Sequence, residues 1–530
     1  MLRALMLTGL LAAGTTAGAL AQTPQRGGTL NFTAPYGTSF STLDVHATPS
    51  VQDDIFASAI HRSLYRWDAA RNEPVLELAT EVNVSADGTV FTYKLRPNAV
   101  FHHGKPLTAD DVIWTYQRVA NPANAFPGAR YLANIKGVAE YADGKATTIS
   151  GLRKIDDHTL EITFVGPVNP GFTLMRGTLA IYPSDIGGTP EFATKPVGLG
   201  PFRFVEHVPG SQAVVERFDR YYKEGRPYLD RINLVIMGDA SARDVAFRNR
   251  EIDVSILGPA QYQAYLADPA LKEHVLEVAE VFTRNIGFNL SYKPFTDRRV
   301  RQAINHAINS PLIIQRLARN KAYPATSWLP LSAPPFDKDA VPYAYDPAKA
   351  RTLLAEAGYA NGFEFEVNAT PNESWGVPIV EAIIPMLAQV GIKVRPRPVE
   401  SAVHAELVTK GEFQAYIWSN ATGPDPLSAL QCFYSKTPRT ACNYTGFNNP
   451  EFDKLFEAAQ AERDPAKQTD LLRQANNLIQ QEAPVWFFNY NKAVMAYQPW
   501  LHGLQPNATE MALQNYEDLW IDSTAPASRR

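Results

Sequence analysis

The amino-acid sequence predicts an α/β protein, because strand-like runs alternate along the chain with well-capped helices. Two such runs are RINLVIM at 231–237 and FEFEVNA at 363–369. No low-complexity tract, short internal repeat or Gly/Ser linker divides the chain. The 530 residues, 45% of them apolar, are enough for two or three hydrophobic cores. We therefore expect several domains whose segments interleave along the sequence.

The first well-defined strand and helix lie within residues 87–119. After the turn at Asp87-Gly88, VFTYKL alternates, so that Phe91, Tyr93 and Leu95 share one face of a half-buried strand. Thr108 is followed three residues later by Asp111, a capping-box spacing that begins a helix. That helix should end near Asn121-Pro122.

Later helices are marked by similar signals. Asp297 and Ser310 can each cap a helix, the second with Pro311 at its first position. Asp346-Pro347 begins another, which should end at Gly358. Asn449-Pro450 begins a fourth. These helices complete the predicted α/β layers.

The first 21 residues have the pattern of a secretory signal peptide. Met1-Leu2-Arg3 is positively charged, residues 4–20 are small and apolar, and Ala19-Leu20-Ala21 is a small-x-small cleavage site. The alternative is a retained membrane anchor, which the interrupting Gly and Thr residues disfavour. No Cys lies near the site, so a lipid anchor is not indicated. We expect a periplasmic protein that begins at Gln22.

The net charge narrows the possible binding partners. The formal net charge of −4 provides no basic excess for nucleic acid or anionic lipid.

The two cysteines, Cys432 and Cys442, would lie in an oxidising compartment and close a short loop. A disulfide is favoured over two free thiols, and a metal site is the third possibility.

No catalytic constellation is apparent. The sequence has no G-x-S-x-G elbow, P-loop, HExxH or strand-linked GxGxxG, and neither Cys has the surroundings of a nucleophile. The sequence therefore predicts a binding protein rather than an enzyme, and a periplasmic hydrolase is a weaker alternative.

The block at 87–119 closely resembles a signature segment of the extracytoplasmic solute-binding proteins of family 5, the peptide, nickel and opine receptors of ABC importers. Further matches occur in the same order: GLGPF at 198–202, PFTDRRVRQAINHAI at 294–308, YDPAKARTLLAEAGY at 345–359, GIKV at 391–394 and NNPEFDKL at 448–455. The resemblance implies a periplasmic binding protein-like fold, with two hinged α/β lobes and an extra domain inserted in the first. The implied ranges are the signal peptide 1–21, lobe I 22–61, 183–283 and 483–530, the inserted domain 62–182, and lobe II 284–482.

The resemblance also implies where the ligand would bind. Relatives line the pocket at positions that correspond here to Ser39, Phe40, Tyr131 and Phe488. A loop that contacts the ligand would begin at Trp418, the last residue of the strand-like run QAYIW at 414–418.

At this loop the chain departs from its peptide-binding relatives. They carry an amine-binding Asp three residues after the Trp, where this chain has Ala421 or Thr422. Asn420 and Asp425 are candidate contacts, although Asn420 could equally bond its own backbone and Asp425 could equally form a turn before Pro426. Trp375 is a further aromatic candidate.

The expected function is that of a monomeric receptor, without a cofactor, that captures a peptide-like or amino-acid-derived small molecule and delivers it to the ABC permease. Loss of the Asp argues against ordinary peptides with a free N-terminus. A metal or haem carrier of the same family is the alternative, built on His102 and His103 with partners from His46, His61 and His158.

Overall fold

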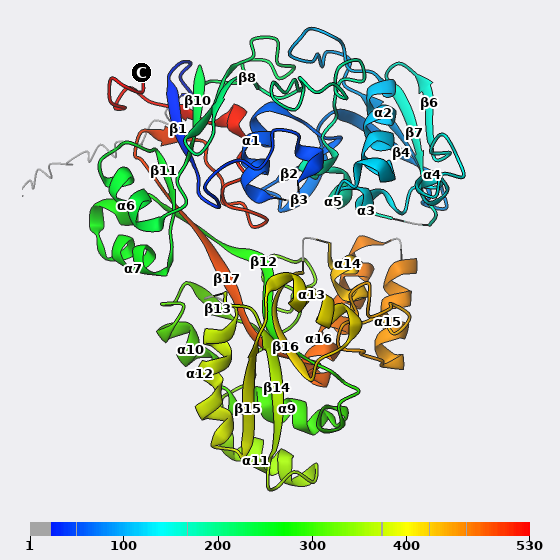
Figure 1. The fold of residues 1–530 in the computed structure, drawn as a ribbon, viewed down its shortest axis with the longest axis vertical. Helices are drawn as coiled ribbons and strands as arrows, with labels where there is room; N and C mark the ends of the chain where they lie inside the picture. Colours follow the sequence, from blue (N-terminus) through cyan, green and yellow to red (C-terminus); the bar gives the residue numbers. More distant parts are fainter. Residues whose placement is uncertain (1–22, 49, 167, 373–374, 423–424, 463) are drawn as a thin grey trace, which may run out of the picture.

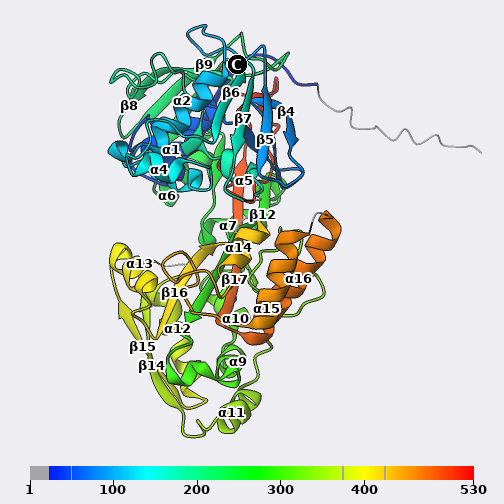
Figure 2. The ribbon, with the colours of Figure 1, turned by 90° about the vertical axis from the view of Figure 1, so that its right-hand side faces the viewer.

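The computed structural model describes residues 23–48, 50–166, 168–372, 375–422, 425–462 and 464–530. The chain folds into two parts joined by two long strands, β12 (Val275–Phe288) and β17 (Val485–Tyr497), which run from one part to the other (Figures 1 and 2). This is the two-lobed α/β architecture that the sequence predicts.

A four-stranded sheet forms one half of the upper part. Its order is β1 (Thr29–Ala34), β10 (Arg231–Ile236), β9 (Gln212–Arg217) and β8 (Phe202–Val208). β1 is parallel to β10 and the other pairs are antiparallel. Helix α1 (Val51–Ile60) contributes Phe56 and Ile60 to the core beneath this sheet. The run at 231–237 is thus a strand, as predicted.

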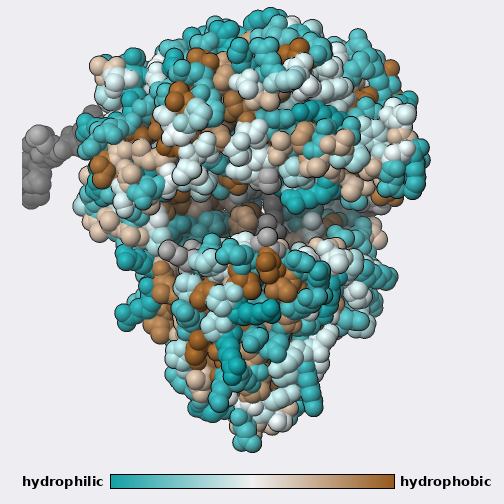
Figure 3. All heavy atoms as spheres, viewed as in Figure 1, coloured by the Kyte–Doolittle hydropathy of each residue, from teal (hydrophilic) through white to brown (hydrophobic). Residues whose placement is uncertain are grey.

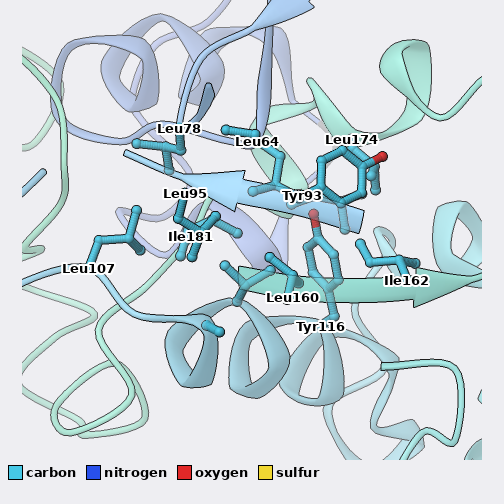
Figure 4. Close-up of a cluster of buried hydrophobic side chains, with 14 of the residues drawn as sticks. Leu64, Leu78, Tyr93, Leu95, Leu107, Tyr116, Leu160, Ile162, Leu174 and Ile181 are labelled. Carbon is cyan, nitrogen blue, oxygen red and sulfur yellow. The ribbon is translucent and has the colours of Figure 1, made fainter. Parts of the chain in front are cut away.

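The other half of the upper part has a sheet of its own, in the order β4 (Ala79–Val84), β5 (Val90–Leu95), β7 (Thr159–Thr163) and β6 (Leu152–Asp156). Phe91, Tyr93 and Leu95 of β5 are buried, and Figure 4 shows Tyr93 and Leu95 in one cluster with Tyr116 of helix α2 (Ala109–Ala120). The Asp111 carboxylate accepts hydrogen bonds from the Thr108 amide, 3.0 Å away, and hydroxyl, 2.9 Å away. The predicted strand and capping box are confirmed.

A mixed sheet runs from the upper part into the lower part. Its order is β11 (Val254–Ile256), β17, β12, β16 (Ala415–Ala421), β14 (Phe363–Ala369) and β15 (Ile392–Pro398), with β13 (Ala322–Pro324) paired to β17, and β11 lies at its upper end (Figure 1). The core of the lower part contains Ile304, Phe365, Ile383 and Trp486. The helices around it are α9 (Arg298–Ala307), α10 (Ser310–Arg316), α11 (Pro347–Glu356), α12 (Val377–Ala388), α13 (Ser401–Lys410), α14 (Pro426–Gln431), α15 (Pro450–Ala461) and α16 (Pro465–Glu482).

Short elements complete the chain. In the upper part they include β2 (Tyr65–Asp68), β3 (Glu73–Leu76), α3 (Ala129–Leu132), α4 (Val138–Ala142), α5 (Gly171–Leu174), α6 (Ala240–Arg248), α7 (Pro259–Ala267), α8 (Pro269–Lys272), β18 (Leu501–His502) and β19 (Trp520–Ile521). Single 3-10 turns are η1 (Val45–Ala47), η2 (Pro122–Asn124), η3 (Gly177–Leu179), η4 (Lys293–Thr296) and η5 (Tyr516–Asp518).

Most predicted helix starts are confirmed. The side chains of Asp297, Asp346 and Asn449 each accept a backbone N–H of the helix that follows. The start at Ser310 is wrong by one residue. Asn309 caps α10 by accepting the Leu312 amide at 3.0 Å, because its side-chain oxygen reaches the first turn and Ser310 is already helical.

The domain boundaries taken from the resemblance stay predictions. β12 continues through the expected junction at 283–284 without a break, so the first-lobe and second-lobe ranges share one strand. The proposed signal peptide lies outside the described residues. Within the described ranges, no helix is both long and apolar enough to cross a membrane.

Candidate ligand site between the two parts

Two cavities lie beside β12 where it passes between the two parts, and one of them also reaches β17. The first-lobe cavity, of about 340 Å³, is lined by α1 and by residues from the segments 61–67, 127–131, 175–180 and 507–515. The hinge cavity, of about 270 Å³, is lined from both parts of the molecule. Phe282, Thr509 and Glu510 line both cavities. Figure 3 shows that the surface is hollowed between the two parts. The two cavities therefore form adjoining sections of one recess.

A cluster of two arginines and a tyrosine lines the first-lobe cavity. The guanidinium carbons of Arg130 and Arg176 lie 4.7 Å and 4.3 Å from the centre of the Tyr131 ring. Arg130 also donates a hydrogen bond of 2.8 Å to the Tyr131 hydroxyl. The ring supports both cations through cation–π contact and leaves their N–H groups available.

Asp54 of α1 faces the same cavity. Burial, with the nearby charge of Asp53, raises the pKa of Asp54 to about 7, although Arg176 opposes the shift. A Cβ atom at Gly177 would lie 2.3 Å from the Asp54 Oδ1, so only glycine allows the chain this close to the carboxylate. Near neutral pH this carboxyl group is therefore partly protonated.

The hinge cavity contains charges of both signs. Glu280 and Arg284 of β12 lie 3.6 Å apart, and Lys321 donates to the Lys492 carbonyl at 2.6 Å. Burial lowers the pKa of Lys321 to about 8 and raises that of Glu510 above its ordinary value. The cavity can thus offer donors to an anion and acceptors to a cation.

A buried ionic network lies behind the first-lobe cavity. Arg62 pairs with Glu517 at 2.7 Å, and Lys223 contacts both Glu517, at 2.8 Å, and Glu77, at 2.7 Å. Although burial opposes ionisation, Arg62 and Lys223 hold the pKa of Glu517 well below its usual range. The network joins Arg62 and Glu77 to the C-terminal segment that carries Glu517. It also neutralises Arg62, which lines the cavity.

Of the predicted contact residues, Tyr131 lines the first-lobe cavity. Phe40 is 4% exposed and packs on Phe56 in the upper core, while Phe488 is 1% exposed and stacks on Trp486 in the lower core. Neither ring reaches the wall of the two cavities. Ser39 is half-buried and its hydroxyl donates to the Phe40 carbonyl.

The expected ligand loop at Trp418 is instead a continuation of strand β16. Trp418 pairs with Asn285 and Asn420 with Thr283, because β12 is long enough to extend the ladder. The half-buried Trp418 ring stacks on Tyr444, with ring centres 5.8 Å apart. Asn420 Oδ1 accepts from Asn285 Nδ2 at 2.8 Å. Their ligand contacts stay predictions, although the neighbouring Ser419 lines the hinge cavity.

The remaining candidates occupy the same end of the lower part. Asp425 caps α14 by accepting the Leu427 amide at 3.2 Å, and burial raises its pKa to about 6. Thr422 is buried and its hydroxyl donates to the Val281 carbonyl. Trp375 is half-buried, and its amide donates to Asn372.

The sequence did not single out Arg130, Arg176, Phe282, Arg284, Lys321 or Glu510. These residues come from distant segments that only the folded chain brings together, and no short spacing links them. The one available signal was Tyr131, whose predicted role pointed to the segment that carries Arg130.

The disulfide between Cys432 and Cys442 is present, with Cα atoms 4.8 Å apart. It links the end of α14 to the loop that carries Tyr444, the stacking partner of Trp418. The favoured pairing is confirmed.

Three of the five histidines proposed for a metal, His46, His102 and His103, have separate partners. His102 contacts the Gly200 carbonyl and the Gly198 amide, His46 contacts the Ala180 carbonyl and Arg118, and His103 contacts Asp185. Across the part of the chain that the structure describes, no group of three or more His, Cys, Asp or Glu side chains could hold a metal ion. The carrier alternative is not favoured.

Residues 73–441 match the family described as bacterial extracellular solute-binding proteins, family 5 Middle. The chain belongs to this family. The glutathione-binding protein GsiB of Escherichia coli K12 is 28% identical over 88% of this chain and 90% of its own length. Among solved structures, AgaA of A. tumefaciens R10 with agropinic acid is 25% identical (TM-score 0.71, 93% of this chain and 99% of that one). HbpA2 of Haemophilus parasuis is 24% identical (TM-score 0.81, 93% and 100%) and shows the same fold.

Proposed function

We propose that this protein is the periplasmic receptor of an ABC importer that holds a peptide-like or amino-acid-derived molecule between its two lobes and delivers it to the membrane permease, without catalysis. The observation that carries the proposal is the recess at the hinge strands, where two cavities meet at Phe282, Thr509 and Glu510.

The chemistry of the recess suits such a ligand. Phe282 and Tyr131 supply aromatic surface, and the hinge cavity provides Arg284 and Lys321 beside Glu280 and Glu510. A micromolar receptor needs only about −8 kcal/mol, which a few aromatic contacts and satisfied polar groups can provide. Because both parts line the hinge cavity, a ligand there stabilises the closed arrangement by contacting both.

The relatives favour amino-acid-derived ligands, since one is named for glutathione and another was solved with agropinic acid. The family resemblance implies that peptide-binding relatives carry, at the position of Ala421 or Thr422, an Asp that pairs with the peptide's amine. This chain lacks that carboxylate, so unmodified di- and tripeptides should bind weakly, because a buried ammonium without a partner is costly. In glutathione the α-amine has a carboxylate on the same carbon, so its charge is partly balanced within the ligand. Glutathione is therefore the first molecule to test.

Calorimetry on protein freed of bound molecules by mild unfolding and dialysis tests the proposal. We expect glutathione or an N-acetylated peptide to bind, and Phe282→Ala to weaken that binding by about 10- to 100-fold. Phe363→Ala is the matched control, since Phe363 is a half-buried aromatic residue of the lower core that lines neither cavity. Absence of binding across peptides and amino-acid derivatives, or an equal loss in both variants, would contradict the proposal.

Periplasmic location rests on the proposed signal peptide. We expect N-terminal sequencing of the exported protein to begin at Gln22, after Ala19-Leu20-Ala21. Recovery of the intact N-terminus in a membrane fraction would show that the segment is retained as an anchor.

A further inference from the structure

The first-lobe cavity has more positive charge than its own acidic groups balance. Its lining arginines are Arg62, Arg66, Arg130 and Arg176. Arg62 pairs with Glu517, and Arg66 lies 2.9 Å from Glu77. Within the described ranges, no carboxylate lies within 4.0 Å of the guanidinium nitrogens of Arg130 or Arg176.

The acidic groups of the same cavity do not cancel these two cations. Among the described residues that line it, only Asp54 and Glu510 carry carboxyl groups. Burial raises the pKa of both, that of Asp54 to about 7, so each holds its proton more tightly than a free side chain does. The cavity therefore attracts an anion. The side chains of Arg130 and Arg176 are themselves exposed, so water screens each charge interaction, and the attraction depends on two cations acting on the same anion.

Neutral donors in the same wall lack partners. Trp67 and Thr178 both line the cavity. The indole Nε1 of Trp67 and the hydroxyl Oγ1 of Thr178 are buried, and neither atom has a hydrogen-bond partner within the described ranges. Thr178 is 7% exposed, and His61, also in the wall, is 3% exposed with neither ring nitrogen bonded. A buried donor without an acceptor costs free energy, so such a group points to a missing acceptor.

From these observations we propose that the first-lobe cavity is a carboxylate subsite, in which Arg130 and Arg176 pair with an acidic group of the ligand while Trp67 and Thr178 donate to it. The inference rests on the proposed function and specifies its substrate class as an anionic peptide-like molecule. The ring of Tyr131 holds the two guanidinium groups in place, so little side-chain entropy is lost when the carboxylate arrives.

Matched probes test this subsite. The N-acetylated tripeptides Ac-Ala-Glu-Ala and Ac-Ala-Gln-Ala differ in one carboxylate and have no amine, and glutathione can be compared with its C-terminal amide. We expect the acidic member of at least one pair to bind more than about tenfold tighter by calorimetry. Arg176→Gln and Arg130→Gln should each reduce that preference to a few-fold, and Arg176→Lys should retain part of it.

Arg248→Gln is the matched control. Arg248 also lies over a tyrosine, 4.9 Å from the centre of the Tyr265 ring, but lines neither cavity. The Arg248→Gln variant should keep the full preference for the acidic probe. Circular dichroism should show that all variants are folded.

The outcomes separate the two proposals. Equal binding of the acidic and neutral members, or an undiminished preference in both glutamine variants, overturns the subsite and leaves the receptor function standing. A co-purified small molecule without any acidic group, identified by mass spectrometry, does the same. Failure of every probe to bind overturns the proposed function and the subsite together.

Discussion

Asp54 shows how a single residue in the cavity wall responds to its surroundings. Burial raises its pKa to about 7. In the unfolded chain the group ionises near its ordinary value of 3.8, so between these two values the folded state binds more protons. The group therefore makes the protein less stable as the pH rises from about 4 to 7.

We expect Asp54→Asn to be more stable than the parent protein, with a difference that grows over that pH range and levels off above it. The gain above neutrality should be about 1–3 kcal/mol, less than the full pKa shift implies because the residue is only half-buried. Melting temperatures at about pH 5 and pH 8 measure it. A pH-independent difference would show that Asp54 titrates normally.

At the scale of elements, the β16 strand and the disulfide together arrange the aromatic side of the lower part. β12 extends β16 through Trp418 to Ala421, and the Cys432–Cys442 bond holds the loop that places Tyr444 against Trp418. The sequence predicted the Cys432–Cys442 bond and the start of β16. It did not predict where β16 ends, because that depends on the length of β12, its partner strand, which is distant in sequence.

Removing the disulfide should lower stability and loosen this aromatic stack. For so short a loop, we expect Cys432→Ser/Cys442→Ser to lose about 2–3 kcal/mol. The near-ultraviolet circular dichroism should change because Tyr444 loses its fixed position over Trp418. Thiol titration of the unreduced, denatured parent protein should find no free thiol, and two titratable thiols would contradict the bond.

At the scale of the whole molecule, the buried network of Arg62, Glu77, Lys223 and Glu517 connects segments from both ends of the chain. It joins residues 62–77 to the C-terminal segment directly behind the first-lobe cavity. Because the pKa of Glu517 is depressed, its contribution is present above about pH 4.5 and is lost as the pH falls through the folded value.

Glu517→Gln should therefore destabilise the protein strongly, by about 3–5 kcal/mol, since Arg62 and Lys223 stay buried with one carboxylate fewer. Thermal unfolding near neutral pH measures the loss. Glu406→Gln is the control, because its ion pair with Lys410 is exposed and solvent-screened and should contribute little to stability. Equal effects of the two variants would contradict a structural role for the network.

The sequence by itself determined the α/β class, the family, most helix starts and the disulfide. Each depends on local chemistry: alternation in β5, the Thr108–Asp111 capping box, or two cysteines close in sequence. Only the tertiary structure decided which side chains line the recess. It buried Phe40 and Phe488 in separate cores, and it brought Arg130, Arg176 and Asp54 to one wall. Burial and long-range contact depend on how distant segments pack, which no local spacing encodes.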